Sequence, residues 1–277
     1  AGVKMRKKLA IILPSVCAGL ALIILIGLMC TGYFVGWGPF AEMANLRFEK
    51  LAGNDEKYAV ERVEPLPGSP LSGKHILFLG SSVTYGSASL QTTFAEYIAK
   101  RNNATFVKEA VSGTTLVDEG VGSYISRLRK LNKEEKFDLF ICQLSTNDAT
   151  QKKALGNVTA RGTAQFDTHT VCGAIEFIIC YVRETWNCPV LFYTNAYYES
   201  AEYAAMVEAL YSVREKYGIG VIDLYTDKDF NNITDEERAL WMSDAIHPTR
   251  AGYLEWWTPA MEQSLYAFWN EINGANK

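Results

Sequence analysis

A serine in this chain has a sequence context that suits nucleophilic catalysis. Ser82 follows an apolar run at 76–79 and lies in the glycine-bounded segment GSSVTYG at 80–86. Such a segment can present a hydroxyl at the end of a buried strand, although most Gly-Ser-Ser sequences are simple turns. A strand followed by a glycine-containing loop could also hold a phosphate or a flavin. The segment lacks the Gly-x-Ser-x-Gly of the α/β-hydrolase elbow and the Gly-x-x-x-x-Gly-Lys of a P-loop, so its meaning depends on residues elsewhere.

One of the three histidines has the context expected of a general base. Asp244 lies three residues before His247, and a turn can bring its carboxylate to the imidazole. A carboxylate on one ring nitrogen fixes the tautomer and leaves the other nitrogen to accept a serine proton. A helix-capping aspartate beside a surface histidine is the alternative reading, and the pair alone does not decide between them.

The other two histidines are expected to have other roles. His75 opens the first predicted strand, roughly 16 Å from Gly80 at about 3.3 Å per residue, and therefore lies at the wrong end of the sheet. His169 lies near a predicted helix start, where a solvated helix-cap residue is expected and a place beside the substrate is the alternative.

The elements that must position these residues form an alternating pattern. Continuous apolar runs predict strands at 75–80, 105–111, 137–144, 189–194 and 220–224, and helical patterns occupy 92–101, 123–131, 167–185, 200–217 and 250–272. Continuous apolar strands are typical of a parallel sheet covered on both faces. The sequence therefore predicts an α/β fold, a three-layer α/β/α sandwich with a five-stranded parallel sheet. Ser82, Gly113 and Asn147 each follow a strand and should share its carboxyl edge.

The N-terminus predicts a membrane anchor. Residues 9–30 contain no charged residue, and at about 1.5 Å per residue they can cross a hydrocarbon core of roughly 30 Å. The preceding segment 1–8 is short and basic, and positive residues stay in the cytoplasm. We expect a single-pass protein of the cell membrane with a cytoplasmic N-terminus and an extracytoplasmic domain. A cleaved signal peptide is the alternative, although its apolar region is typically about 7–15 residues.

The composition of the chain indicates the nature of the remaining segments and excludes some classes of partner. Residues 31–73 are predicted to be a stalk or linker, because Pro65, Pro67 and Pro70 favour an extended spacer before the domain at 74–277. Acidic residues number 31 and basic ones 27, four of which lie within residues 1–40. An acidic outer domain argues against a nucleic-acid partner. The six cysteines show no metal-ligand spacing, so unpaired core thiols are expected, although the compartment permits a disulfide.

Four short blocks together resemble the SGNH hydrolases, also called GDSL-type esterases and lipases. The blocks are GSS at 80–82, AVSGT at 110–114, STND at 145–148 and DAIHP at 244–248. Ser81 replaces the usual aspartate of the first block, and Ser145 replaces the glycine of the third. The blocks occur in the family's order, and the resemblance covers roughly residues 74–273.

This resemblance implies a flavodoxin-like SGNH fold and acyl transfer to Ser82. His247 would be the base and Asp244 the residue that orients it. The backbone N–H groups of Ser82 and Gly113 and the side-chain amide of Asn147 would form the oxyanion hole. No metal and no cofactor are implied. Asp148 is expected to accept hydrogen bonds from loop amides.

The substrate is less well determined by the sequence. Segment 149–166 is polar, and no large apolar insertion could form a lipid-binding lid. Tyr85 and His169 are candidate substrate-binding residues, and Tyr197 and Tyr198 could line the same edge. These features favour removal of small acyl groups, such as acetyl, from carbohydrate or cell-envelope esters. An acyltransferase with the same triad and a glycan acceptor is one alternative, and a non-catalytic glycan-binding domain is another.

Overall fold

The computed structural model describes residues 2–35 and 38–274. Residue 1 of the predicted basic segment, residues 36–37 of the predicted linker and residues 275–277 of the predicted domain lie outside the described residues. The chain forms two compact units, Ala1–Lys50 and Leu51–Lys277.

The first unit is built on one long helix. Helix α1 (Gly2–Val35) contains the apolar stretch Val16–Phe34, whose mean hydropathy is 2.2 and of which only 6% is buried. A short 3₁₀ helix, η1 (Ala41–Arg47), follows it, and the Arg47 guanidinium donates a hydrogen bond to the Phe34 carbonyl over 3.1 Å. By length and composition α1 can cross a membrane, and the same properties fit a signal sequence.

The second unit contains the five parallel strands that the sequence predicts. Their order is β2-β1-β3-β4-β5, and every neighbouring pair is parallel. The strands are β1 (His75–Gly80), β2 (Thr105–Ala110), β3 (Leu139–Gln143), β4 (Val190–Tyr193) and β5 (Gly220–Ile222). Strands β3 and β4 are buried along their whole length, whereas β2 lies at an edge and is only partly buried. The continuous apolar runs therefore mark the strands covered on both faces.

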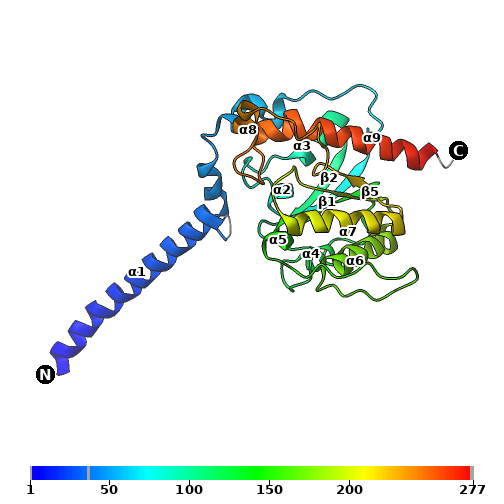
Figure 1. The fold of residues 1–277 in the computed structure, drawn as a ribbon. Coiled ribbons are helices and arrows are strands. Elements are labelled where there is room, and N and C mark those ends of the chain that lie inside the picture. The colour runs from blue at the N-terminus through cyan, green and yellow to red at the C-terminus, as the bar shows by residue number, and fades with distance from the viewer. Residues whose placement is uncertain (1, 36–37, 275–277) are drawn as a thin grey trace. The chain divides into compact units, whose positions relative to one another are not determined.

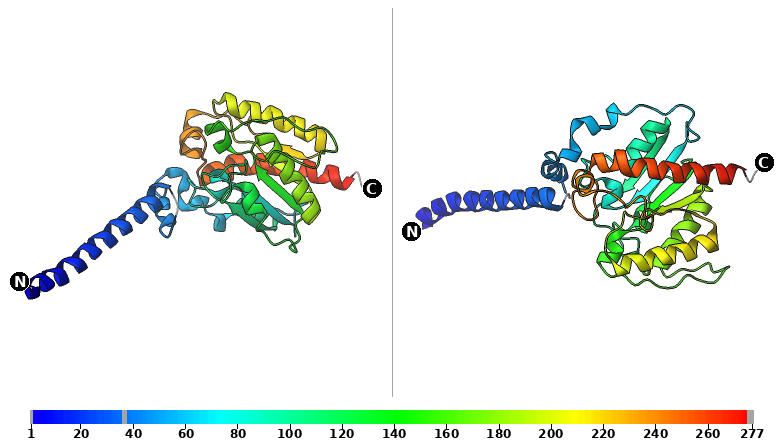
Figure 2. Two further views of the ribbon diagram at one scale, coloured as in Figure 1. Left: turned by 90° about the horizontal axis from the view of Figure 1, so that it is seen from below. Right: turned by 45° about the horizontal axis from the view of Figure 1, so that its top comes forward.

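Helices cover both faces of this sheet, as Figures 1 and 2 show. Leu77 and Phe140 belong to a buried cluster with α4, α6 and α7, whereas Ile76 and Ile141 belong to a second cluster with α3 and α9. Alternate residues of each strand thus face opposite layers, which confirms the three-layer α/β/α sandwich. The helices are α2 (Ser82–Tyr85), α3 (Phe94–Asn102), α4 (Tyr124–Leu128), α5 (Thr146–Thr150), α6 (Val171–Trp186), α7 (Ala201–Tyr217), α8 (Asp235–Trp241), the π-helical η5 (Gly252–Trp257) and α9 (Thr258–Gly274).

Residues 51–73 differ from the predicted extended stalk, because they belong to the second unit. Short 3₁₀ turns, η2 (Ala52–Asn54), η3 (Glu56–Tyr58) and η4 (Val60–Arg62), alternate with extended backbone. Tyr58, Val63 and Leu71 are buried, and the Tyr58 carbonyl accepts a 2.6 Å hydrogen bond from the Tyr97 hydroxyl. Pro67 and Pro70 lie in turns, and the buried apolar side chains attach the segment to the domain.

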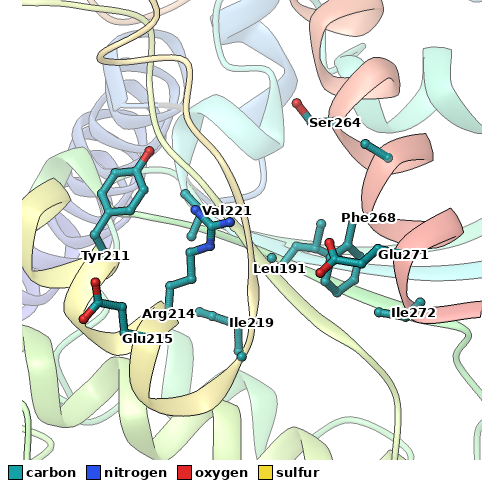
Figure 3. A pocket seen from close by; sticks show the side chains of 13 residues that line it. Leu191, Tyr211, Arg214, Glu215, Ile219, Val221, Ser264, Phe268, Glu271 and Ile272 are labelled. Atoms are coloured by element: carbon teal, nitrogen blue, oxygen red, sulfur yellow. The ribbon is translucent and has the colours of Figure 1, made fainter. Parts of the chain in front are cut away.

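A cavity of about 600 Å³ lies beside the edge strand β5, between α7 and α9 (Figure 3). Leu191, Val221 and Phe268 form apolar walls, and Arg214 and Glu271 also line it. Its lining includes Gly218 to Val221 at the start of β5, whereas Ser82 and Asn147 follow the carboxyl ends of their strands. None of the predicted site residues lines this cavity.

Candidate active site

Ser82 lies where strand β1 turns into the one-turn helix α2. The strand ends at Gly80, and Ser81 then directs the chain into the helix with φ −117° and ψ −140°. Helix α2 stops at Gly86, whose φ of +85° is left-handed, and a Cβ there would lie 2.7 Å from a methyl group of Thr93. Glycine is therefore needed to end this turn so tightly.

Side chains from neighbouring strands hold the nucleophile turn. The Gln143 side-chain oxygen accepts hydrogen bonds from the Ser81 N–H over 2.9 Å and from the Thr84 hydroxyl over 2.9 Å. The Thr84 hydroxyl also lies 2.6 Å from the Tyr193 hydroxyl. A Cβ on Gly80 would lie 1.8 Å from this Thr84 oxygen, so the strand can end here only in glycine. The turn is therefore fixed by β3 and β4, as well as by its own helix.

The structure brings Ser82, His247 and Asp244 into one hydrogen-bonded chain. His247 Nε2 lies 2.8 Å from Ser82 Oγ, and His247 Nδ1 lies 2.8 Å from Asp244 Oδ2. An ionised carboxylate can only accept hydrogen bonds, so Nδ1 carries the proton and Nε2 accepts from the serine hydroxyl. This is the tautomer that a general base for serine requires.

The environment of Asp244 keeps its carboxyl ionised. Partial burial acts to raise its pKa, but the hydrogen bond and charge of His247 and the backbone N–H groups of Ile246 and His247 outweigh it and lower the pKa to about 2. Those backbone groups donate to Asp244 Oδ1 over 2.8 and 2.9 Å. The carboxylate is therefore negative throughout the neutral range and can stabilise an imidazolium.

The histidine loop is anchored on both sides. An isolated antiparallel bridge joins Met242 to Pro248. On the sheet side, the side-chain amide of the buried Asn195, which follows β4, donates to the Ile246 carbonyl over 3.4 Å. His247 therefore belongs to a short closed loop at the carboxyl ends of the central strands.

Gly113 and Asn147 come from two neighbouring loops. Gly113 follows β2 with φ +79°, and Asn147 lies in the first turn of α5. The Asn147 side-chain amide donates to the Thr114 carbonyl over 3.0 Å. An amide NH₂ carries two N–H groups, and the hydrogen bonds among the described residues use one of them. The structure thus places Asn147 directly beside the Gly113 loop.

Asp148 stabilises the loop that contains Gly113. Its carboxylate accepts hydrogen bonds from the Leu116 N–H over 2.7 Å and the Val117 N–H over 3.1 Å. Burial raises its pKa, although these amides and the Ser145 hydroxyl act against the rise. This agrees with the expected role as an acceptor for loop amides.

Arg127, on α4, is a buried residue that the sequence analysis missed. Its guanidinium donates to the Gly80 carbonyl over 2.8 Å and to the Thr114 hydroxyl over 3.1 Å. It also donates to the Glu109 carbonyl over 2.9 Å and to the Gly122 carbonyl over 3.0 Å. One side chain therefore connects the end of the nucleophile strand to the loop that contains Gly113.

The two further candidates, Tyr85 and His169, lie on different elements. Tyr85 is the last residue of α2, one turn after Ser82. His169 is exposed, directly before the Thr170 cap of α6, and its backbone N–H donates to Asp167 over 3.1 Å. A substrate contact remains a proposal for both. His75 has the expected structural surroundings: its ring nitrogens lie 2.7 Å from the Thr105 hydroxyl and 3.0 Å from a Glu135 carboxylate oxygen.

Comparison with known proteins identifies the family. The sequence model of the GDSL-like Lipase/Acylhydrolase family matches residues 78–254, which is more than half of the chain. The chain therefore belongs to this family of SGNH hydrolases, and membership implies an ester hydrolase. No curated protein matches the chain by sequence.

Several solved structures share this fold. A protein from Lactobacillus plantarum matches with TM-score 0.57 and 19% identity, over 72% of this chain and 98% of its own. A Bacteroides ovatus protein described as a GDSL-like lipase matches with TM-score 0.53 and 20% identity, over 70% and 98%. A family two carbohydrate esterase from Clostridium thermocellum, solved with cellohexaose, matches with TM-score 0.50 and 14% identity, over 76% and 66%. At these identities the likeness concerns the fold.

Proposed function

We propose that this protein is a membrane-anchored serine esterase that acts outside the cytoplasm. It removes small acyl groups, such as acetyl, from carbohydrate or other cell-envelope esters. The observation that carries the reaction type is the hydrogen-bonded chain from Ser82 Oγ through His247 to Asp244. The family gives the same class of chemistry.

In the acylation step, Ser82 Oγ attacks the ester carbonyl carbon while His247 Nε2 takes the hydroxyl proton. The ionised Asp244 stabilises the resulting imidazolium. When the tetrahedral intermediate collapses, the bond to the alcohol oxygen breaks, and His247 returns the proton to that oxygen. The products are the free alcohol and an acyl group on Ser82. In deacylation, water replaces the serine as the nucleophile, and the same proton transfers release the acid and restore Ser82.

The negative oxygen of each intermediate needs fixed donors. We assign this role to the backbone N–H groups of Ser82 and Gly113 and to the second amide N–H of Asn147. One such donor typically lowers the barrier by roughly 3 kcal/mol. Arg127 and Asp148 hold the two loops that supply these groups.

A small acyl group and a polar alcohol suit the surroundings of the site. The segment between α5 and α6 is largely exposed and polar, and Lys153 in it pairs with Glu119. It offers no apolar lid over Ser82, which a long acyl chain would need. The Clostridium thermocellum carbohydrate esterase has the same fold, so this architecture is compatible with a carbohydrate substrate.

The proposed location depends on α1. Its apolar stretch Val16–Phe34 is long enough to span a membrane. Basic residues cluster on its N-terminal side, at positions 4 and 6–8, whereas the first basic residue on its C-terminal side is Arg47. Positive flanks stay in the cytoplasm, which would put the catalytic unit outside. The ester substrate would then belong to the cell envelope.

The test of the reaction uses the full chain in detergent micelles. Wild type should react with a fluorophosphonate probe and turn over p-nitrophenyl acetate, and Ser82→Ala should do neither. Ser81→Ala is the matched control, because it removes a hydroxyl one residue away and should retain the label. Equal labelling of wild type and Ser82→Ala would remove Ser82 from the mechanism.

The substrate is tested by product analysis. Wild type should release acetate from O-acetylated oligosaccharides and act poorly on p-nitrophenyl esters of long acyl chains. The reverse preference would contradict the proposed substrate class. When an acceptor glycan is added, transfer of the acetyl group faster than release of acetate would instead assign an acyltransferase.

A further inference from the structure

A second pocket lies at the same edge of the sheet as the triad. It has a volume of about 270 Å³, and it is lined by Tyr197, Tyr225, Thr226, Asp227, Lys228 and Asn231. Tyr197 comes from the loop after β4, and the other lining residues come from the loop after β5. The pocket therefore joins two loops at the carboxyl ends of adjacent strands, where ligands of open α/β sheets bind.

The two loops of the pocket are held together by the hydrogen bonds of one asparagine. Asn231 Oδ1 accepts the Tyr197 N–H over 2.8 Å. Its side-chain amide donates to the carbonyls of Leu224 over 2.7 Å and of Asp227 over 2.6 Å. The Asp227 carboxylate in turn accepts the Phe230 N–H over 2.9 Å. These hydrogen bonds fix the backbone on both sides of the pocket.

Tyr197 presents an aromatic ring to solvent at this place. It is 55% exposed, and its ring centroid lies 5.2 Å from that of the buried Tyr225 at an angle of 38°. The neighbouring Tyr198 instead packs inward, with its ring centroid 5.1 Å from that of Tyr203. Of the two tyrosines predicted to line the edge, Tyr197 is thus the one that offers a surface to a ligand.

The pocket is connected to the catalytic loop through Asn195. The Asn195 side chain bonds the carbonyl of Ile246, the residue before His247. Tyr197 lies two residues after Asn195, which is at most about 7 Å of chain. The chain after β4 thus runs from a contact with the histidine loop directly to the Tyr197 side of the pocket.

We propose that this pocket binds a sugar residue next to the acylated one, so that the protein selects acylated oligosaccharides over acylated monosaccharides. This inference rests on the proposed function. A sugar ring has an apolar face, which can lie on the Tyr197 ring, and polar edges, which can meet Asp227 and Lys228 at the rim. A long acyl chain would need a larger, enclosed apolar channel than a cavity of about 270 Å³ with charged residues in its lining.

The experiment compares kcat/KM of the full chain in micelles for three substrates: O-acetylated cellotetraose, O-acetylated glucose and p-nitrophenyl acetate. Tyr197→Ala should lower kcat/KM for the tetraose about tenfold more than for the other two, mainly through KM, because an aromatic contact is lost. Tyr197→Phe keeps the ring and should retain the wild-type preference. Because Tyr197 is exposed, neither variant should disturb folding, and thermal unfolding checks this.

The results distinguish a failure of the proposed sugar site from a failure of the proposed esterase reaction. If Tyr197→Ala changes all three substrates by the same factor, the sugar site is wrong while the esterase stands. A change in preference between p-nitrophenyl octanoate and acetate would assign the pocket to an acyl chain and also overturn the proposal. If wild type hydrolyses none of the three esters, the proposed function fails, and the sugar site fails with it.

Discussion

Arg127 shows how one buried side chain can connect the separate segments of the proposed active site. Its planar guanidinium donates in several directions at once, to the end of β1 and to the loop after β2. A lysine carries the same charge but has a single nitrogen, so it cannot reproduce this fork of hydrogen bonds. The geometry of the nucleophile and that of the oxyanion donors are therefore linked through Arg127.

Arg127→Lys should lower kcat for p-nitrophenyl acetate about tenfold with little change in KM, because the transition state loses aligned donors while ground-state binding remains. It should also lower the free energy of unfolding by about 1–3 kcal/mol through the lost hydrogen bonds. Arg129→Lys is the matched control, since that side chain is half exposed, pairs with Asp118 and lies over the Phe177 ring, all away from Ser82 and Gly113 in the hydrogen-bond pattern. Steady-state kinetics and urea unfolding measure both effects, and an equal loss in the two variants would contradict the positioning role.

Asp244→Asn should lower kcat by roughly 10³–10⁴-fold, because an amide cannot fix the required tautomer or stabilise the imidazolium. The same carboxyl affects stability at low pH. Its folded pKa of about 2 lies below the ordinary 3.8, so the unfolded chain takes up the proton first as the pH falls. Asp244 therefore stabilises the fold above about pH 4, and this contribution is lost as the pH falls towards 2.

Urea unfolding of wild type and Asp244→Asn at pH 6 and pH 3 tests the stability effect. The difference between the two proteins should be smaller at pH 3. A difference that is independent of pH would show that the carboxylate contributes nothing through ionisation.

Some site residues could be predicted from the sequence and others could not. Ser82 and His247 lie in short segments whose residue types and order indicate chemistry. Arg127 and Gln143 act through hydrogen bonds to residues distant in the chain. Nothing in the local sequence of Arg127 distinguishes it from an ordinary polar residue, whereas Gln143 is a polar residue at the end of an otherwise apolar strand.

At the scale of elements, the sheet was predictable because covered strands must be continuously apolar. The packing of the segment before it was not, since the sequence alone does not show that residues 51–73 belong to the domain. Its anchors are three separate apolar residues among prolines and charges, and such spacing has neither helical nor strand periodicity. The surface that accepts them exists only in the folded domain.

Leu71→Ala tests this segment. Leu71 is completely buried in the cluster that contains α3 and α9, so the substitution should lower the free energy of unfolding by about 2–5 kcal/mol. Leu46→Ala, in the first unit, removes the same group from a side chain that is half exposed. This substitution should change the free energy of unfolding by less than about 0.5 kcal/mol. Similar effects of the two substitutions would mean that residues 51–73 do not stabilise the domain.

At the scale of the molecule, the two units have separate tasks. The unit Leu51–Lys277 contains both hydrophobic clusters and the triad, whereas the apolar stretch of α1 has almost no protein around it. An apolar helix that is not buried in protein is stable in a lipid bilayer.

Expression of the full chain and of a chain limited to residues 51–277 tests this division. The full chain should remain in the membrane fraction after an alkaline carbonate wash, and the shorter chain should be soluble and turn over p-nitrophenyl acetate. Recovery of the full-length expression product in the soluble fraction, shortened at its N-terminus, would indicate a cleaved signal sequence instead.

The distance along the chain between the nucleophile and its base has a consequence for the timing of activity. Ser82 and His247 are 165 residues apart, so at ribosomal rates of 5–20 residues per second the serine is made roughly 10–30 s before its histidine. Throughout that interval its hydroxyl has no base and is an ordinary, weakly nucleophilic alcohol. Under the proposed mechanism, a nascent chain therefore has no esterase activity until the part of the domain that contains His247 has been made and folded.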